Sequence, residues 1–289
     1  MKHHGKQISL VLGSGGARGY AHIGVIEELE RQGYEIASIS GSSMGALIGG
    51  LYACGRLDDY REWVLGLDAL DVASLLDITF SRGGIIEGEK VFEHLAKMIG
   101  KRRIEELPIK FTAVATDIVR KKEVWFQQGD LLRAVRASIA IPSIFTPVRI
   151  GRMVLVDGGA LNPLPVAPTQ SDLTDLTIAV NLYGEIPRPE IEMEEEENLR
   201  KRKIESTVRE LFERNREETK FTMFDILDKT FDTMQDALTR YRIGGYPPDI
   251  IVDISMHVCG TFDFHRAKEV IEAGRRAAKE ALEHPKERV

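Results

Sequence analysis

The sequence predicts an α/β fold in which a mostly parallel sheet is covered by helices on both faces. Three observations lead to this prediction. Apolar runs of strand length alternate with helical patterns along most of the 289 residues. The first run ends in a glycine-rich loop that opens a helix, and the second ends in a GxSxG turn that opens another. Units of strand, loop and helix are how parallel strands are connected.

The strands are expected to be short and buried, because apolar and β-branched residues dominate them and turn residues bound them. They are predicted at 7–12, 36–40, 111–115, 123–126, 153–156, 176–181 and 250–254. Helical patterns lie between most of them, including 89–99 and 131–138. Length alone allows one domain or two. We expect a single domain over 1–289.

The glycine-rich loop at 13–19 reads GSGGARG. A dinucleotide-binding loop needs glycine at its first, third and sixth positions, but the sixth position counted from Gly13 is Arg18. The other interpretation is an oxyanion hole formed by the N–H groups around Gly15 and Gly16. We favour it because the GxSxG turn follows in the same βαβ unit. Arg18 is expected to brace the backbone or contact a headgroup, unless it is simply solvated.

The GxSxG turn at 41–45 (GSSMG) places Ser43 between a predicted strand and a run of small residues at 46–53. That is the context in which such a serine becomes an exposed nucleophile. Gly41 and Gly45 leave room around a strained turn. The letters alone also suit an ordinary turn between a strand and a helix. Only one predicted strand, 7–12, precedes the strand that leads into this turn, so the order of a standard α/β-hydrolase fits poorly.

A candidate base follows the apolar run at 153–156. Asp157 stands at its end, before Gly158 and Gly159. An Asp-Gly turn is the alternative interpretation. The carboxylate could accept the proton of Ser43 if the two strand ends are neighbours in a parallel sheet, where ligand sites gather at the carboxyl ends of strands. Its site would then have to desolvate it and raise its pKa, since an ordinary aspartate is a weak base.

Histidine is the other candidate for the base. His257 and His265 follow the last predicted strand, where a triad hydrolase carries its histidine. The remaining histidines lie in helical patterns or near the chain ends and are expected to be structural or solvent-facing. They are His3, His4, His22, His94 and His284.

Taken together, these motifs resemble the patatin-like phospholipase family over roughly residues 7–183. The segment 137–148 (ASIAIPSIFTPV) is similar to the family's A-S-x-A-x-P-x-x-F segment, and 84–88 (GIIEG) to a stretch of its bacterial members. The resemblance implies a patatin-like fold, a three-layer α/β/α sandwich. It implies Ser43 as nucleophile, Asp157 as base and an oxyanion hole at Gly15 and Gly16. The supporting positions are Arg18, Gly41, Gly45, Gly158 and Gly159.

The resemblance also implies an activity. The expected enzyme is a serine acyl hydrolase that cleaves fatty-acyl esters, glycerophospholipids or lysophospholipids, through an acyl-enzyme and without a metal or organic cofactor. The apolar residues of 139–145 are candidates for the wall of an acyl pocket. Two alternatives stay open. One is a carboxylesterase or acyltransferase acting on small or carrier-bound acyl groups, and the other is a regulatory protein that keeps the fold without turnover.

Composition agrees with this expectation and adds little. A net charge of −6, from 39 basic and 45 acidic residues, implies no basic surface for nucleic acid or anionic lipid. Two cysteines are too few for a disulfide framework and favour a reducing cytoplasm. The apolar run at 8–12 is far shorter than the ~20 residues that cross a bilayer. We expect a cytoplasmic protein that meets lipid from the aqueous side, with peripheral contact at the inner membrane surface.

Segment 186–245 is a predicted helical insertion before the last strand. A block of charged residues at 190–203 precedes an amphipathic helix over 221–242. Apolar residues recur along that helix at steps of three and four, as Phe224, Leu227, Phe231, Met234, Leu238 and Tyr241. This stripe has three uses that the sequence leaves open: packing on the domain, capping an acyl pocket or facing lipid, and self-association as a homo-oligomer.

Overall fold

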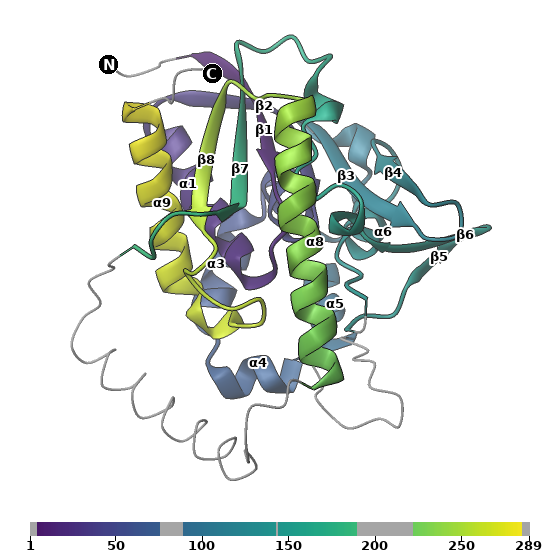
Figure 1. Ribbon diagram of the computed structural model, residues 1–289. Helices are drawn as coiled ribbons and strands as arrows, with labels where there is room; N and C mark the ends of the chain where they lie inside the picture. Colours follow the sequence, from purple (N-terminus) through teal and green to yellow (C-terminus); the bar gives the residue numbers. More distant parts are fainter. Residues whose placement is uncertain (1–4, 76–88, 143, 190–221, 285–289) are drawn as a thin grey trace.

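The computed structural model describes residues 5–75, 89–142, 144–189 and 222–284. The motif at 84–88, the charged block at 190–203, His3 and His4, and the side chain of Phe224 lie outside the described residues. Figure 1 shows a central sheet with α1 and α9 side by side and α8 crossing in front.

The strands are β1 Lys6–Leu12, β2 Tyr34–Ser42, β3 Lys110–Asp117, β4 Lys122–Phe126, β5 Val148–Ile150, β6 Met153–Asp157, β7 Leu176–Gly184 and β8 Ile250–Ser255. The α-helices are α1 Ala21–Arg31, α2 Met44–Ala53, α3 Leu57–Leu65, α4 Ala69–Leu75, α5 Glu89–Ile99, α6 Leu131–Ser138, α8 Met223–Gly245 and α9 Ala267–Glu283. Short 3₁₀ turns are η1 Gly16–Tyr20, η2 Ile104–Glu106, η3 Gly158–Ala160, η4 Ala167–Thr169 and η5 Phe264–Arg266. Each of the seven predicted strands lies inside an observed one, and β5 was not predicted.

The strands form one sheet in which hydrogen-bonded neighbours follow the path β5-β6-β3-β2-β1-β7-β8, and β4 also pairs with β3. The central pairs, β3 with β2, β2 with β1, β1 with β7 and β7 with β8, are parallel. The pairs of β3 with β4, β3 with β6 and β5 with β6 are antiparallel. The predicted α/β fold with a mostly parallel sheet is therefore confirmed, with an antiparallel region at one edge.

Helices cover the two faces of the sheet unequally. Side chains alternate between the faces of a strand. In β1, Leu10 and Leu12 belong to the large core that α1, α2 and α9 complete. Val11, between them, faces a smaller core with Ala179, on which Ile243 of α8 also packs. The helix α8 thus lies at the thinly covered face of the sheet.

The C-terminal ends of β2 and β6 meet along β3. Residues 113–117 of β3 pair with β4 on one side. On the other side Val114 pairs with Ser42 of β2, and the next residue, Ala115, pairs with Asp157 of β6. A strand has one neighbour on each side, so β2 and β6 share the side opposite β4 and are placed end to end. The expectation that these two strands are parallel neighbours is wrong, because β6 runs antiparallel to β3.

The face that α8 turns to the domain is polar. Gln235 is 5% exposed and Thr239 2% exposed. Three residues of the predicted apolar stripe are exposed: Leu227 (47%), Met234 (50%) and Tyr241 (78%). Phe231 and Leu238 are half-buried. The stripe as a whole therefore does not pack into the core. The reason is that the buried face of α8 meets polar partners.

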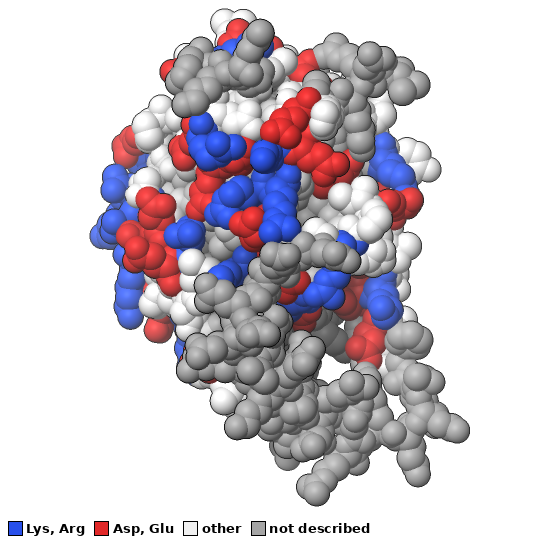
Figure 2. All heavy atoms as spheres, turned by 90° about the vertical axis from the view of Figure 1, so that its left-hand side faces the viewer, with Lys and Arg blue, Asp and Glu red and all other residues white. Residues whose placement is uncertain are grey.

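The face over α9 carries both signs of charge. Figure 2 shows basic and acidic side chains intermingled there rather than a field of one sign. Arg275 pairs with Glu27 of α1 and with Glu272, and Arg276 also pairs with Glu272. In the part of the chain that the structure describes, no helix is long and apolar enough to cross a bilayer.

Candidate active site

Ser43 occupies a strained turn between β2 and α2. Its backbone angles are φ 54° and ψ −125°, a region that residues other than glycine rarely adopt. The turn is tight because two glycines allow close approach. A Cβ on Gly41 would lie 2.4 Å from the carbonyl oxygen of Gly45, and a Cβ on Gly45 would lie 2.0 Å from that of Leu12. The strain is consistent with a turn built to present one side chain.

The structure brings Ser43 and Asp157 together. The Ser43 hydroxyl donates a hydrogen bond of 2.5 Å to Oδ2 of Asp157. The N–H of Gly159 donates to Oδ1 at 2.7 Å. Both side chains are buried, with 1% of Ser43 and none of Asp157 exposed. The neighbouring Gly158 packs against β3, where a Cβ would lie 2.1 Å from the carbonyl oxygen of Val114.

Burial changes the acidity of the carboxylate. It raises the pKa of Asp157 to about 7, although the hydrogen bonds from Ser43 and Gly159 act in the opposite direction. A proton acceptor works best when its pKa is near the pH at which it operates. The desolvated carboxylate is therefore a better match to the serine hydroxyl than an ordinary aspartate would be.

The last residue of α6 and the segment that follows it hold both residues in place. The N–H of Ser43 donates to the Ser138 hydroxyl at 2.9 Å, and this hydroxyl donates to the Val114 carbonyl at 2.6 Å. Two residues further on, the Ala140 carbonyl accepts the N–H of Asp157 at 2.9 Å. Ser138 was not among the predicted site residues. The signal for it was its place in the segment 137–148.

We expect Ser138→Ala to lower kcat on any accepted ester about tenfold, with KM little changed. The variant removes the acceptor of the Ser43 N–H inside the protein, and a small misplacement of reacting groups has a large effect on rate. The matched control is Ser40→Ala, since the Ser40 hydroxyl is buried and has no hydrogen-bond partner in the described residues. A Ser138→Ala enzyme with wild-type kcat would contradict this role.

The glycine-rich loop is anchored on both sides of its centre. Three of its N–H groups donate to backbone carbonyls elsewhere in the chain. The pairs are Gly13 to Val180 at 3.2 Å, Ser14 to Pro163 at 2.8 Å and Ala17 to Thr261 at 2.9 Å. No described residue accepts the N–H of Gly15 or Gly16, which lie between these anchors. These two groups are therefore available to a ligand's oxygen.

Two side chains fix the carbonyl groups of this loop. Arg18 is 2% exposed, so it does not reach the surface. Its Nε donates to the Gly15 carbonyl at 3.1 Å, and its Nη2 pairs with Asp232 of α8. His22 Nε2 donates to the Gly13 carbonyl at 2.8 Å. Burial lowers the pKa of His22 to about 4, so this histidine is neutral at physiological pH. It has the structural role expected of a helical histidine.

The exposure and contacts of three other histidines differ from those of His22. His257 is exposed. His94 stacks on Trp63, with ring centroids 4.4 Å apart. His265 lies in η5 and is half-buried. The described residues contain no group of three or more His, Cys, Asp or Glu side chains placed to hold a metal ion.

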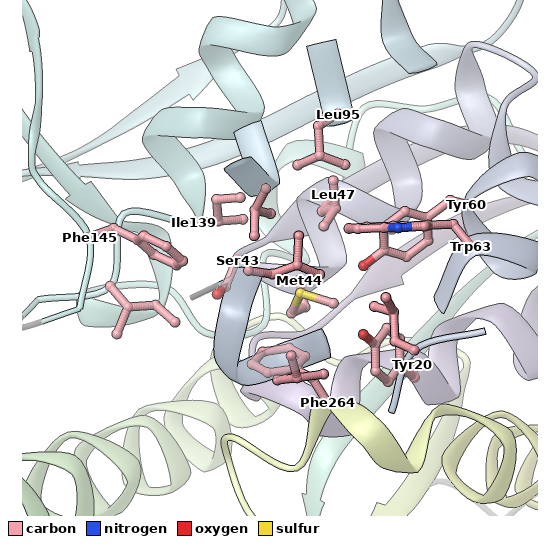
Figure 3. A pocket seen from close by; sticks show the side chains of 15 residues that line it. Tyr20, Ser43, Met44, Leu47, Tyr60, Trp63, Leu95, Ile139, Phe145 and Phe264 are labelled. Carbon is pink, nitrogen blue, oxygen red and sulfur yellow. The ribbon is translucent and has the colours of Figure 1, made fainter. Parts of the chain in front are cut away.

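An apolar pocket opens beside Ser43. Its empty space, including the opening to solvent, is about 640 Å³. Figure 3 shows Ser43 at the edge of this space, with aromatic and aliphatic side chains gathered around it. The lining comprises Tyr20, Ser43, Met44, Leu47, Tyr60, Trp63, Leu67, Val72, Leu75, Val91, Leu95, Ile139, Ile141, Phe145 and Phe264. Three of these belong to the predicted wall at 139–145.

A second apolar groove adjoins the pocket and extends to α8. Ile141 lines both, and the empty space of the groove, including its opening to solvent, is about 610 Å³. Its other lining residues are Pro142, Ile144, Leu227, Asp228, Thr230, Phe231, Met234 and Phe262. Exposed apolar residues of α8 thus line a groove that shares Ile141 with the pocket beside Ser43.

A strained serine between a parallel strand and a helix has the geometry of a nucleophile elbow. Here its hydroxyl is hydrogen-bonded directly to a buried carboxylate rather than to a histidine. The family model described as patatin-like phospholipase matches residues 10–169. The chain belongs to this family, and the resemblance predicted from its motifs is confirmed.

Proteins with similar sequences are consistent with membership of this family. An uncharacterised NTE family protein of Mycobacterium tuberculosis is 39% identical over 96% of this chain and 91% of its own length. A lysophospholipase of Emericella nidulans is 31% identical over 62% of this chain and 12% of its own length. Among solved structures, VipD from Legionella pneumophila aligns with a TM-score of 0.46 and 15% identity, over 96% of this chain and 66% of VipD.

Proposed function

We propose that this protein is a serine acyl hydrolase that cleaves fatty-acyl esters of glycerophospholipids or lysophospholipids. The observation that carries the proposal is the 2.5 Å hydrogen bond from Ser43 to the buried Asp157, beside an apolar pocket. Membership of the patatin-like phospholipase family supports it. The Emericella nidulans relative, named a lysophospholipase, favours the same substrate class.

Acylation begins with Asp157 as general base. Its carboxylate takes the Ser43 proton while Oγ attacks the ester carbonyl carbon. The carbonyl oxygen becomes an oxyanion, which accepts hydrogen bonds from the N–H groups of Gly15 and Gly16. The ester C–O bond then breaks. The alcohol leaves with the proton that Asp157 held, and the acyl group stays on Ser43.

Hydrolysis of the acyl-enzyme repeats the cycle with water. Asp157 takes a proton from the water molecule as its oxygen attacks the acyl carbonyl. Collapse of the second oxyanion breaks the bond to Ser43 Oγ, which recovers its proton from Asp157. The fatty acid leaves. A carboxylate with a pKa of about 7 returns and accepts this proton at neutral pH more readily than an unshifted one.

The lining of the pocket selects an apolar acyl chain, and the polar remainder of the lipid stays at the mouth. A panel of p-nitrophenyl esters of increasing chain length, run beside a labelled phospholipid and a lysophospholipid, tests this. We expect kcat/KM to rise with chain length and both lipids to be hydrolysed. Turnover restricted to short esters would favour a carboxylesterase of small substrates. No turnover of any ester would favour a regulatory protein.

A further prediction concerns the apolar residues of α8 in the groove. We expect the double variant Leu227→Ser, Phe231→Ser to lower activity on aggregated lipid several-fold while activity on a soluble short-chain ester is kept. Both residues line the groove that adjoins the pocket, and exposed apolar area strengthens contact with lipid. The assay compares vesicles with p-nitrophenyl butyrate.

The control for this variant is Tyr241→Ser, which removes an exposed apolar residue of the same helix that lies outside the groove. Equal losses on both substrates with a lower Tm would show that Leu227 and Phe231 serve the fold instead. Phe224, the other apolar residue at the start of the stripe, has a side chain outside the described residues.

A further inference from the structure

The helix α8 contacts both loops of the candidate active site through polar side chains. Asp232 pairs with Arg18 at the glycine-rich loop. One turn further on, Gln235 accepts a hydrogen bond of 3.0 Å from the Tyr183 hydroxyl. Near the end of the helix, Arg242 donates to the Leu161 carbonyl at 2.9 Å, in the loop that follows Asp157. These partners are far from α8 in sequence, so α8 joins the glycine-rich loop to the loop that follows Asp157.

The contact at Arg18 joins a buried cation to a partly exposed carboxylate. The Arg18 side chain is 3% exposed and that of Asp232 26% exposed. The guanidinium lies over the Tyr183 ring, 4.6 Å from its centroid. Burial disfavours the charged form, yet Tyr183 and Asp232 together hold the pKa of Arg18 above its ordinary value. The guanidinium therefore stays charged and keeps its donors directed at fixed acceptors.

The geometry of the peptide group connects this ion pair to the oxyanion hole. Arg18 Nε donates to the carbonyl oxygen of Gly15. That carbonyl and the N–H of Gly16 belong to one planar peptide unit, in which a trans bond points the two groups in opposite directions. Fixing the direction of the Gly15 carbonyl thus fixes the direction of the Gly16 N–H. Glycines on both sides leave this peptide otherwise easy to rotate.

We propose that Asp232 is a positioning residue for the oxyanion hole. By holding Arg18, it sets the plane of the peptide between Gly15 and Gly16, so that the Gly16 N–H points at the developing oxyanion. This inference rests on the proposed function. The helix α8 then belongs to the catalytic apparatus, although it supplies no group that touches the reacting atoms.

The same helix offers a matched control. Asp236 lies one turn after Asp232 and pairs with Arg240 at 2.8 Å. The Arg240 side chain is 59% exposed and its other partner is Glu185, away from the glycine-rich loop. Asp232→Asn and Asp236→Asn make the same chemical change on one helix. Only the first removes a partner of Arg18.

The test compares the two variants on a soluble p-nitrophenyl ester and with a trifluoromethyl ketone that forms a tetrahedral adduct on the serine. We expect Asp232→Asn to lower kcat by at least tenfold with KM within twofold, and to weaken the ketone by a similar factor. Asp236→Asn should stay within twofold of wild type on both. Prolonged fluorophosphonate labelling counts folded sites and corrects for any unfolded fraction.

A merely structural ion pair would lower Tm and the count of labelled sites but leave kcat per site and ketone affinity unchanged, and that result overturns the proposal. If Asp232→Asn does not fold, the double variant Arg18→Met, Asp232→Leu replaces the buried pair with apolar groups, which often preserves stability. It should fold with a similarly reduced kcat per site, and wild-type kcat would overturn the proposal. Failure of the proposed function is distinguished by a Ser43→Ala variant that still hydrolyses esters.

Discussion

Replacing Ser43 with alanine should reduce ester hydrolysis to background and abolish labelling by a fluorophosphonate, a loss on the order of 10⁴–10⁶ in kcat. The Ser43 hydroxyl donates a hydrogen bond to the carboxylate of Asp157. Its removal takes away one hydrogen bond and little volume, so the protein should remain folded. Turnover of a p-nitrophenyl ester, peptide mapping of the label and a melting curve measure the three expectations.

The adjacent Ser42 is the natural control. Its hydroxyl is buried, and no described residue is its hydrogen-bond partner. It belongs to the last position of β2, whereas Ser43 occupies the strained turn. Ser42→Ala should therefore stay active and be labelled. An inactive Ser42→Ala beside an active Ser43→Ala would show that Ser42, and not Ser43, is the nucleophile.

Asp157→Asn is expected to have the next largest effect, a loss on the order of 10²–10⁴ in kcat, which is the usual contribution of a positioned general base. The amide keeps the size of the side chain but cannot take the Ser43 proton. His257→Ala and His265→Ala should each leave most of the activity. A histidine variant as inactive as Ser43→Ala, with Asp157→Asn nearly unaffected, would assign the base to that histidine.

The pH dependence follows from the same carboxyl group. Burial raises the pKa of Asp157 to about 7, and only the ionised form can act as base. Wild-type kcat/KM should therefore rise with pH through a single ionisation near neutrality and level off above it. Asp157→Asn should lack this step. A profile that levels off below pH 5 would contradict a raised pKa.

Stability should change with pH in the opposite sense. The folded protein holds the Asp157 proton more tightly than the unfolded chain, whose ordinary value is 3.8. The resulting stabilisation is complete below that value and is lost as pH rises towards 7. Asp157→Asn has no such proton to lose. Its free energy of unfolding, relative to that of wild type, should therefore rise by a few kcal/mol between pH 4 and pH 8, since one pKa unit corresponds to about 1.4 kcal/mol. Urea unfolding of both proteins at pH 4 and pH 8 measures this change. The same difference in unfolding free energy between variant and wild type at both pH values would contradict it.

Much of the fold could be predicted because its signals are local. The bounds of α5 and α6 agree with the predicted 89–99 and 131–138, since apolar spacing and turn residues fix a helix within its own sequence. The three residues of β5 were missed, because so short a run carries no periodicity. Ser43 and Asp157 could be singled out as candidates because each stands at a strand end beside glycine residues.

What the sequence could not predict depends on partners far along the chain. The direction of β6 follows from its pairing with β3, which no local pattern encodes. The stripe of α8 indicated a helix but not the face that packs, because the buried face meets Arg18 and Tyr183. These partners are 214 and 52 residues away in the sequence. Asp232 and Ser138 have no motif around them that marks a role. Their positions became meaningful only when the chain was folded.

The meeting of β2 and β6 along β3 makes catalysis sensitive to strand register. Only three residue pairs join β6 to β3, with Asp157 opposite Ala115. A slip of one residue would move the carboxylate about 3.3 Å along the strand and turn its side chain to the other face of the sheet. Such a protein would keep its composition, its helices and most of its core, yet Ser43 would lose its hydrogen bond to Asp157. Under the proposed function, turnover per molecule therefore reports whether β6 has paired with β3 in its native register.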